Sequence, residues 1–68
     1  MPAQRGEELQ GEIATPVETI HPGAVGKAEL RGTSWNARNA AMRTLAAGER
    51  CRVVGIDGLQ LLLEPENP

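Results

Sequence analysis

The 68-residue sequence predicts a small all-β domain, and three observations support this fold class. First, Asp57 and Gly58 separate two apolar runs and favour the tight turn of an antiparallel hairpin over residues 50–64. Second, both runs are apolar on both faces, which suits a closed barrel better than an open sheet with one solvated face. Third, three strand-like segments and one short segment of helical spacing precede the hairpin. This order predicts a five-stranded OB-fold-like barrel, with an SH3-like barrel as the alternative.

The first two strands are predicted from alternating side chains. Residues 10–20 are rich in Thr, Val and Ile, and Pro16 among them indicates an edge or a bulge because it has no N–H to donate. Residues 21–23, His-Pro-Gly, then form a turn. The second strand covers residues 24–31, in which Gly26 indicates a bulge or a sharp corner of the barrel.

The third strand covers residues 34–39, after a turn at Gly32 and Thr33, and contains Trp35, the only aromatic residue. Two interpretations of Trp35 stay open. As a core residue it would fill the barrel, with its indole N–H hydrogen-bonded at the rim. As a contact residue it would be exposed and would anchor a partner or a base.

Residues 40–47 change to helical spacing. Asn39 suits an N-cap and Gly48 suits the position after the last turn, so we predict a short helix of about two turns, or a helical loop, between strands three and four. Met42 and Leu45 would then plug one end of the barrel, and an anchor role is the alternative for Met42.

The hairpin completes the predicted barrel. Leu59, Leu61 and Leu63 share one face of the last strand, and Pro65 ends the pairing. The predicted core side chains are Val17, Ile20, Val25, Leu30, Trp35, Met42, Leu45, Val53, Ile56, Leu59, Leu61 and Leu63.

No combination of residues typical of catalysis is found. The chain has one His and one Cys, and it has neither a nucleophile motif nor a Gly-rich phosphate loop. Cys51, beside valines, is interpreted as a small buried hydrophobe, and a single cysteine excludes an internal disulfide. His21 is interpreted as a turn residue. We therefore predict no catalytic residue, no cofactor and no metal site. No apolar run is long enough to span a membrane, and we expect the chain to be soluble.

The charge is unevenly distributed. The net charge is −2 at pH 7, but residues 27–52 contain six cations and two carboxylates, and both flanking segments are acidic. The basic middle is either a binding face or a set of solvated strand edges. OB-folds often bind single-stranded nucleic acid by stacking bases on aromatic rings, and only Trp35 is available here. A nucleic-acid-binding module using Lys27, Arg31, Arg38 and Trp35 is therefore the alternative function.

Two stretches of the chain resemble the C-terminal domain of NfeD-like proteins. They read I-H-P-G-A-V-G-K-A-E-L-R-G-T-S-W-N-A-R at residues 20–38 and G-E-R-C-R-V-V-G-I-D-G-L-Q-L-L-L-E-P at residues 48–65. The matching positions are glycines, prolines and core residues, so the resemblance identifies a fold more firmly than a function. They are Pro22, Gly23, Gly26, Gly32, Trp35, Ala37, Gly48, Val53, Val54, Gly58, Leu59, Leu61 and Pro65.

The resemblance implies an OB-like barrel that follows transmembrane helices in a parent protein, and no such helix is expected in this chain. It also implies contact with a stomatin- or prohibitin-like membrane protein, and an influence on membrane protease activity or membrane-protein quality control. The domain itself would be soluble, non-enzymatic and on the cytoplasmic side of the membrane. We expect the barrel at residues 10–65, a disordered lead-in at 1–9 and a tail at 66–68. The expected partner contacts are Arg31, Trp35, Arg38, Met42 and Arg43.

Overall fold

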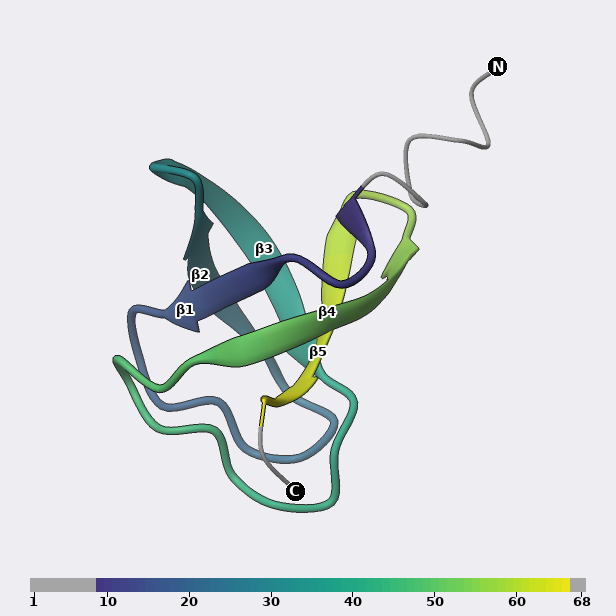
Figure 1. The fold of residues 1–68 in the computed structure, drawn as a ribbon. Coiled ribbons are helices and arrows are strands. Elements are labelled where there is room, and N and C mark those ends of the chain that lie inside the picture. Colours follow the sequence, from purple (N-terminus) through teal and green to yellow (C-terminus); the bar gives the residue numbers. More distant parts are fainter. Residues whose placement is uncertain (1–8, 67–68) are drawn as a thin grey trace.

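The computed structural model describes residues 9–66, in which five β-strands close into a barrel (Figure 1). Around the barrel the order is β1-β2-β3-β5-β4, and β4 pairs back onto β1. β3 and β5 run parallel, and every other neighbouring pair is antiparallel. The predicted five-stranded all-β barrel is thus confirmed. The strands are β1 (Ile13–Pro16), β2 (Val25–Leu30), β3 (Thr33–Asn39), β4 (Cys51–Asp57) and β5 (Gln60–Pro65).

The described residues include one position from each predicted terminal segment. Leu9, from the lead-in, packs against the core. Glu66, from the tail, accepts hydrogen bonds from the Arg50 side chain. The rest of the predicted lead-in, residues 1–8, and of the predicted tail, residues 67–68, lies outside the described residues.

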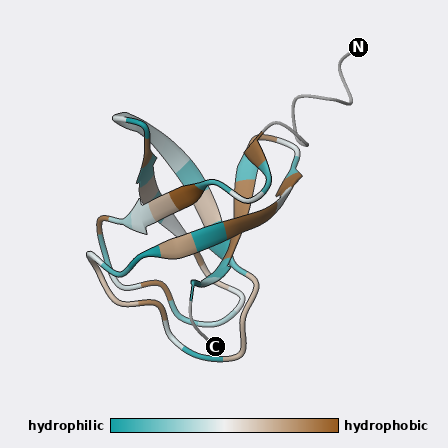
Figure 2. Ribbon diagram, in the orientation of Figure 1, coloured by the Kyte–Doolittle hydropathy of each residue, from teal (hydrophilic) through white to brown (hydrophobic). Residues whose placement is uncertain are grey.

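Inward-facing side chains from all five strands fill the barrel, and Figure 2 shows hydrophobic stretches on β1, β4 and β5. Ile20 and Leu45, from two loops, also belong to this core. They are joined by two backbone hydrogen bonds of 2.9 Å. The buried apolar residues are Ala14, Ile20, Ala28, Leu30, Ala37, Leu45, Cys51, Val53, Leu61 and Leu63.

The predicted core is confirmed for Ile20, Leu30, Leu45, Val53, Leu61 and Leu63. Trp35 and Ile56 are partly buried and pack against it. The prediction is wrong for Val17, Val25, Met42 and Leu59, which are exposed. Val25 lies on the outer face of β2, opposite the exposed Arg38, because its neighbour Gly26 takes the inward position.

The β4–β5 turn lies one residue later than predicted. Asp57 pairs with Gln60, so Gly58 and Leu59 are the two central residues of the turn. Gly58 has a φ of 65°, and a glycine with positive φ at the first central position is typical of a type II′ turn. Leu59 is therefore outside the strand and 83% exposed, whereas Leu61 keeps its predicted inward position.

A bulge in β4 changes which side chains face inward. The register of β4 against β5 shifts by one residue between Val53 and Gly55, which leaves Val54 as the extra residue. Because of the bulge, Ile56 lies on the same inward face of β4 as Val53. Strict alternation would place Ile56 on the outer face.

The predicted helix at residues 40–47 is absent, and this part of the chain forms a loop of bends and turns between β3 and β4. The Asn39 side chain accepts a hydrogen bond from the Ala41 N–H at 2.8 Å, as an N-cap would. Its amide group, however, donates to the carbonyls of Ile20 and Arg43. These contacts stabilise the non-helical loop. A helix of about two turns has only marginal stability on its own, so it does not compete with them.

The loop conformation also determines whether its two large apolar side chains are buried. Leu45 is buried as predicted, because it pairs with Ile20. Met42 is 97% exposed, so its predicted core role is wrong.

β1 is shorter than predicted, and β2 contains no bulge at Gly26. β1 covers only Ile13–Pro16, after which Val17 makes one more hydrogen bond to β2 and the chain leaves the sheet. β2 has no bulge, since its register with β3 is continuous. Gly26 instead lies against Ile20, where a Cβ atom would come within 2.9 Å of Ile20 Cγ1. Among residues 9–66, no helix is long and apolar enough to cross a membrane.

Candidate partner-binding surface

The five residues predicted to contact a partner do not form one patch. Arg31 lies in the β2–β3 turn at one end of the barrel, and Met42 and Arg43 lie in the β3–β4 loop at the other end (Figure 1). Arg38 is exposed on the outer face of β3, and Trp35 is half-buried. The candidates thus divide between the two ends and the wall of the barrel.

Arg31 occupies a strained backbone position. Leu30 pairs with Thr33, so Arg31 and Gly32 are the central residues of the turn. Arg31 has a φ of 54°, the only positive φ of a non-glycine residue in the part of the chain that the structure describes. A left-handed conformation costs a residue with a Cβ atom about 1–2 kcal/mol, and such turns usually contain Asn or Gly here. The Arg31 guanidinium forms an ion pair with Glu12.

Trp35 combines features of both predicted interpretations. It lies opposite Ala28, on the inward face of β3, and packs against the core. Its Nε1 atom is buried but has no hydrogen-bond partner among the described residues, so the predicted bond at the rim is not formed there.

Carboxylates from the acidic flanking segments neutralise much of the basic middle segment. Arg50 Nε donates to Glu66 Oε1 at 2.9 Å, and Arg38 Nη1 lies 3.9 Å from Asp57 Oδ2. The hydrogen bonds between Arg50 and Glu66 raise the pKa of Arg50 and lower the pKa of Glu66. Together with the ion pair at the β2–β3 turn, these contacts weaken the predicted basic face.

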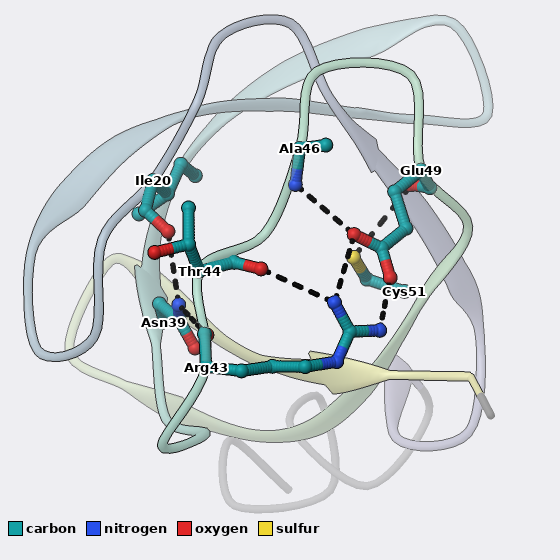
Figure 3. Close-up of polar contacts among 7 residues, drawn as sticks. All are labelled: Ile20, Asn39, Arg43, Thr44, Ala46, Glu49 and Cys51. Atoms are coloured by element: carbon teal, nitrogen blue, oxygen red, sulfur yellow. Dashed lines mark hydrogen bonds and ion pairs between the residues drawn. The ribbon is translucent and has the colours of Figure 1, made fainter. Parts of the chain in front are cut away.

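Asn39 fixes the β3–β4 loop to the end of the barrel (Figure 3). Its side chain is buried, and its Nδ2 atom donates to Ile20 O at 2.9 Å and to Arg43 O at 2.7 Å. Its Oδ1 atom accepts from the Ala41 N–H. One side chain therefore ties β3 both to the β1–β2 connection and to the start of the loop.

An ion pair between Arg43 and Glu49 closes the loop (Figure 3). Arg43 also donates to the Thr44 carbonyl at 3.2 Å, and Glu49 also accepts from the Ala46 N–H at 3.0 Å. The hydrogen bond to Arg43 and the bond from Ala46 lower the pKa of Glu49, and the same pair raises the pKa of Arg43. The charge of Arg43 is thus already satisfied within the loop.

Cys51, the first residue of β4 after this loop, has a buried thiol. Burial, followed by the nearby charge of Glu49, raises the pKa of its thiol to about 11. Its Sγ atom lies 3.6 Å from the Glu49 carbonyl oxygen. The prediction that Cys51 is a small buried hydrophobe is confirmed.

Acid should loosen the loop through Glu49. Because its folded-state pKa is lowered, Glu49 contributes stability above its unfolded-state pKa and loses this contribution as the pH falls. The variant Glu49→Gln should therefore be less stable than the wild type near neutral pH, and the difference should disappear as the pH falls below the lowered pKa of folded Glu49. Urea unfolding followed by Trp35 fluorescence at several pH values would measure this. Glu29→Gln, which alters an exposed carboxylate outside these ion pairs, is the control. A pH-independent difference for Glu49→Gln would contradict this assignment.

A groove lies beside the loop, between its first residues and the end of β5. It has a volume of about 460 Å³, within the range of sites that hold small ligands. Four lining residues are apolar and two are charged: Ala40, Ala41, Met42, Pro65, Arg43 and Glu64. The groove contains both predicted contact residues of this end, Met42 and Arg43.

The sequence did not single out the other residues that build this end. Asn39 was assigned only as a helix cap, although a polar residue at an inward position beside Ala37 indicates a buried hydrogen-bonding role. Glu64 and Pro65 meet the loop because Ala40 N donates to Leu63 O at 2.8 Å, a contact for which the sequence contains no local signal.

The described residues contain no cluster of three His, Cys, Asp or Glu side chains that could hold a metal ion. His21 Nδ1 lies 3.3 Å from Thr44 Oγ1 at the exposed surface, where it joins two loops.

Comparison with known proteins connects this barrel to one family. Residues 6–65 match the NfeD-like C-terminal, partner-binding domain. A membrane-bound protease of Pyrococcus horikoshii is 40% identical over 60 residues, which are 88% of this chain and 13% of that protein.

Two solved structures are similar in sequence and in fold. The C-terminal domain of a stomatin operon partner protein from Pyrococcus horikoshii is 38% identical, with a TM-score of 0.82 over 93% of this chain and 95% of that one. The soluble domain of a membrane protein implicated in regulation of membrane protease activity, from Corynebacterium glutamicum, is 30% identical. Its TM-score is 0.78, over 88% of this chain and 95% of that one. The chain therefore belongs to the NfeD-like family, and residues 6–65 correspond to its C-terminal, partner-binding domain.

Proposed function

We propose that this domain is a non-enzymatic protein–protein interaction module that contacts a stomatin- or prohibitin-like membrane protein. Through this contact it would influence membrane protease activity or membrane-protein quality control, on the cytoplasmic side of the membrane. The observation that carries the proposal is the match to a partner-binding domain over residues 6–65. The names of two relatives, a stomatin operon partner protein and a membrane protein implicated in regulation of membrane protease activity, support the same role.

The geometry favours binding over catalysis. The Cys51 thiol is buried and its pKa is raised, so it is a poor nucleophile at neutral pH. The surface instead offers an open groove that includes the exposed apolar side chain of Met42. These features suit the docking of another protein.

A nucleic-acid-binding role receives less support from the structure. Trp35 is half-buried against the core, and base stacking needs an exposed ring. Arg31, Arg43 and Arg50 form ion pairs with Glu side chains, which reduces the charge available to phosphates.

The proposal can be tested by co-purification from cells that express the parent protein together with a stomatin-type protein. We expect the stomatin-type protein to be captured by the parent and lost when residues 10–65 are deleted. A parent protein without residues 10–65 that captures the same amount would contradict the proposal. The deletion variant must still reach the membrane fraction, which is the control for its expression.

The strain at Arg31 gives a second test. Asn fits a left-handed turn position better than Arg, so Arg31→Asn should raise the free energy of unfolding by up to about 1 kcal/mol. The exposed ion pair with Glu12 that is lost contributes little. If Arg31 contacts the partner, the more stable variant should also capture less of it. Arg31→Asn that unfolds at lower urea concentration would contradict the assigned strain, and unchanged capture would remove Arg31 from the contact surface.

A further inference from the structure

We propose that the groove between the β3–β4 loop and the end of β5 recognises a partner segment in which an apolar side chain is flanked by Lys or Arg. This inference rests on the partner-binding role proposed above and specifies where and how the partner is recognised. It follows from the shape of the groove, from its charge and from the way the loop is held.

The apolar part of the groove suits a single inserted side chain. Ala40 and Ala41 are small, so they leave space beside the larger Met42 and Pro65. Met42 is 97% exposed, and its flexible, polarizable thioether can pack against partners of different shapes. So large an apolar side chain gains by being covered, and its burial by a partner would be favourable.

The charge of the groove selects the residues that flank the inserted side chain. Arg43 is neutralised by Glu49, from outside the groove. Glu64 is exposed and forms no ion pair among residues 9–66, although Arg52 lies opposite it in β4. Glu64 is therefore the charged side chain of the lining that lacks an ion pair among residues 9–66, and a partner cation is its complement.

The groove is also preorganised. The Asn39 side chain holds the Ala41 N–H and the Arg43 carbonyl, and the Ala40 N–H is bonded to Leu63. The loop therefore needs little rearrangement on binding, and the entropic cost of docking is reduced.

The test uses the 68-residue chain labelled with ¹⁵N and two synthetic peptides. In one peptide leucine lies between two lysines, and in the other leucine lies between two glutamates. Titration followed by NMR should shift the amide signals of residues 40–43 and 64 with the lysine peptide and leave them in place with the glutamate peptide. The variant Met42→Gln should weaken binding of the lysine peptide by about fivefold or more. Glu64→Lys should weaken it by a similar factor and allow the glutamate peptide to bind.

Leu59→Gln is the matched control, because Leu59 is also exposed but lies in the β4–β5 turn outside the groove. It should leave peptide binding unchanged. The inference is overturned if neither peptide shifts residues 40–43, if both peptides do so equally, or if Leu59→Gln has the same effect as Met42→Gln. Capture of the stomatin-type protein with no peptide binding would overturn the groove assignment and leave the proposed function standing. Peptide binding at the groove with no such capture would instead contradict the choice of partner.

Discussion

Replacing Asn39 with alanine should lower the free energy of unfolding by about 2–4 kcal/mol. This is a large part of the total, which is about 3–10 kcal/mol for a domain of this size. The variant leaves the Arg43 carbonyl and the Ala41 N–H without the Asn39 side chain as their partner, and it removes one of the two hydrogen bonds to the Ile20 carbonyl, which keeps the one from the Leu45 N–H. Because Asn39 is buried, water cannot readily replace these bonds. Urea unfolding followed by Trp35 fluorescence would measure the loss.

The conservative variant Asn39→Asp distinguishes the hydrogen bonds from the packing, since the two side chains have nearly the same shape. Near neutral pH the new carboxylate would face two carbonyl oxygens where the amide now donates. Its destabilisation should therefore be at least as large as that of Asn39→Ala, and it should shrink as the pH falls and the carboxylate gains a proton. The introduced carboxylate would thus lower the stability of the variant as the pH rises, whereas the Glu49 carboxylate adds stability as the pH rises.

Asn36→Ala provides the control, because Asn36 lies in the same strand but is exposed on the outer face. It should change the free energy of unfolding by no more than about 0.5 kcal/mol. If Asn39→Ala is as mild as Asn36→Ala, the loop is held by other contacts and the hydrogen bonds of Asn39 are dispensable.

The barrel could be predicted from local patterns because most strand segments alternate with a period of two and lie between turn residues. Leu61 and Leu63 were assigned correctly, since alternation within one strand requires only the sequence of that strand. Leu59 was misplaced, and strict alternation alone would place Ile56 on the outer face, because the turn type and the bulge are set by the pairing of two strands. Sequence alternation contains no information about an extra residue opposite a partner strand.

The β3–β4 loop illustrates the same limit more sharply. Ala, Met and Leu favour a helix locally, and the spacing of Ala41, Met42 and Leu45 agrees with one. The conformation is instead determined by Asn39 and by the pairing of Leu45 with Ile20, which lies 25 positions earlier in the chain. Tertiary contacts of this kind override propensity in short segments.

The candidate surface was predictable only in its parts. Met42 and Arg43 were named from the sequence, but Glu64 and Pro65 join them only because β3 and β5 lie side by side. The ion pair between Arg43 and Glu49 also changes the charge distribution that the sequence alone suggests. A residue that counts as a free cation in the composition is neutralised in the fold, so the groove takes its charge from Glu64.

The second large effect is expected from Gly26→Ala, which should lower the free energy of unfolding by about 1–3 kcal/mol. The added Cβ atom would lie 2.9 Å from Ile20 Cγ1 and 3.0 Å from Glu18 Oε2. Ile20 cannot move freely because it is buried, and moving the exposed Glu18 carboxylate would break its hydrogen bond from the Lys27 N–H. Displacing Ile20 would also strain its pairing with Leu45, so amide exchange at Leu45 should accelerate along with global unfolding.

Gly55→Ala is the matched control, since Gly55 is also a strand glycine without a left-handed φ. Its added Cβ atom would lie 3.5 Å from Leu62 Cδ1, an ordinary van der Waals distance. The substitution should therefore be neutral or should stabilise the barrel by up to about 1 kcal/mol, through the reduced entropy of the unfolded chain. Equal losses for the two variants would show that glycine itself is required in these strands. A loss confined to Gly26→Ala would show that close packing beneath Ile20 holds the loop, and with it the groove, against the end of the barrel.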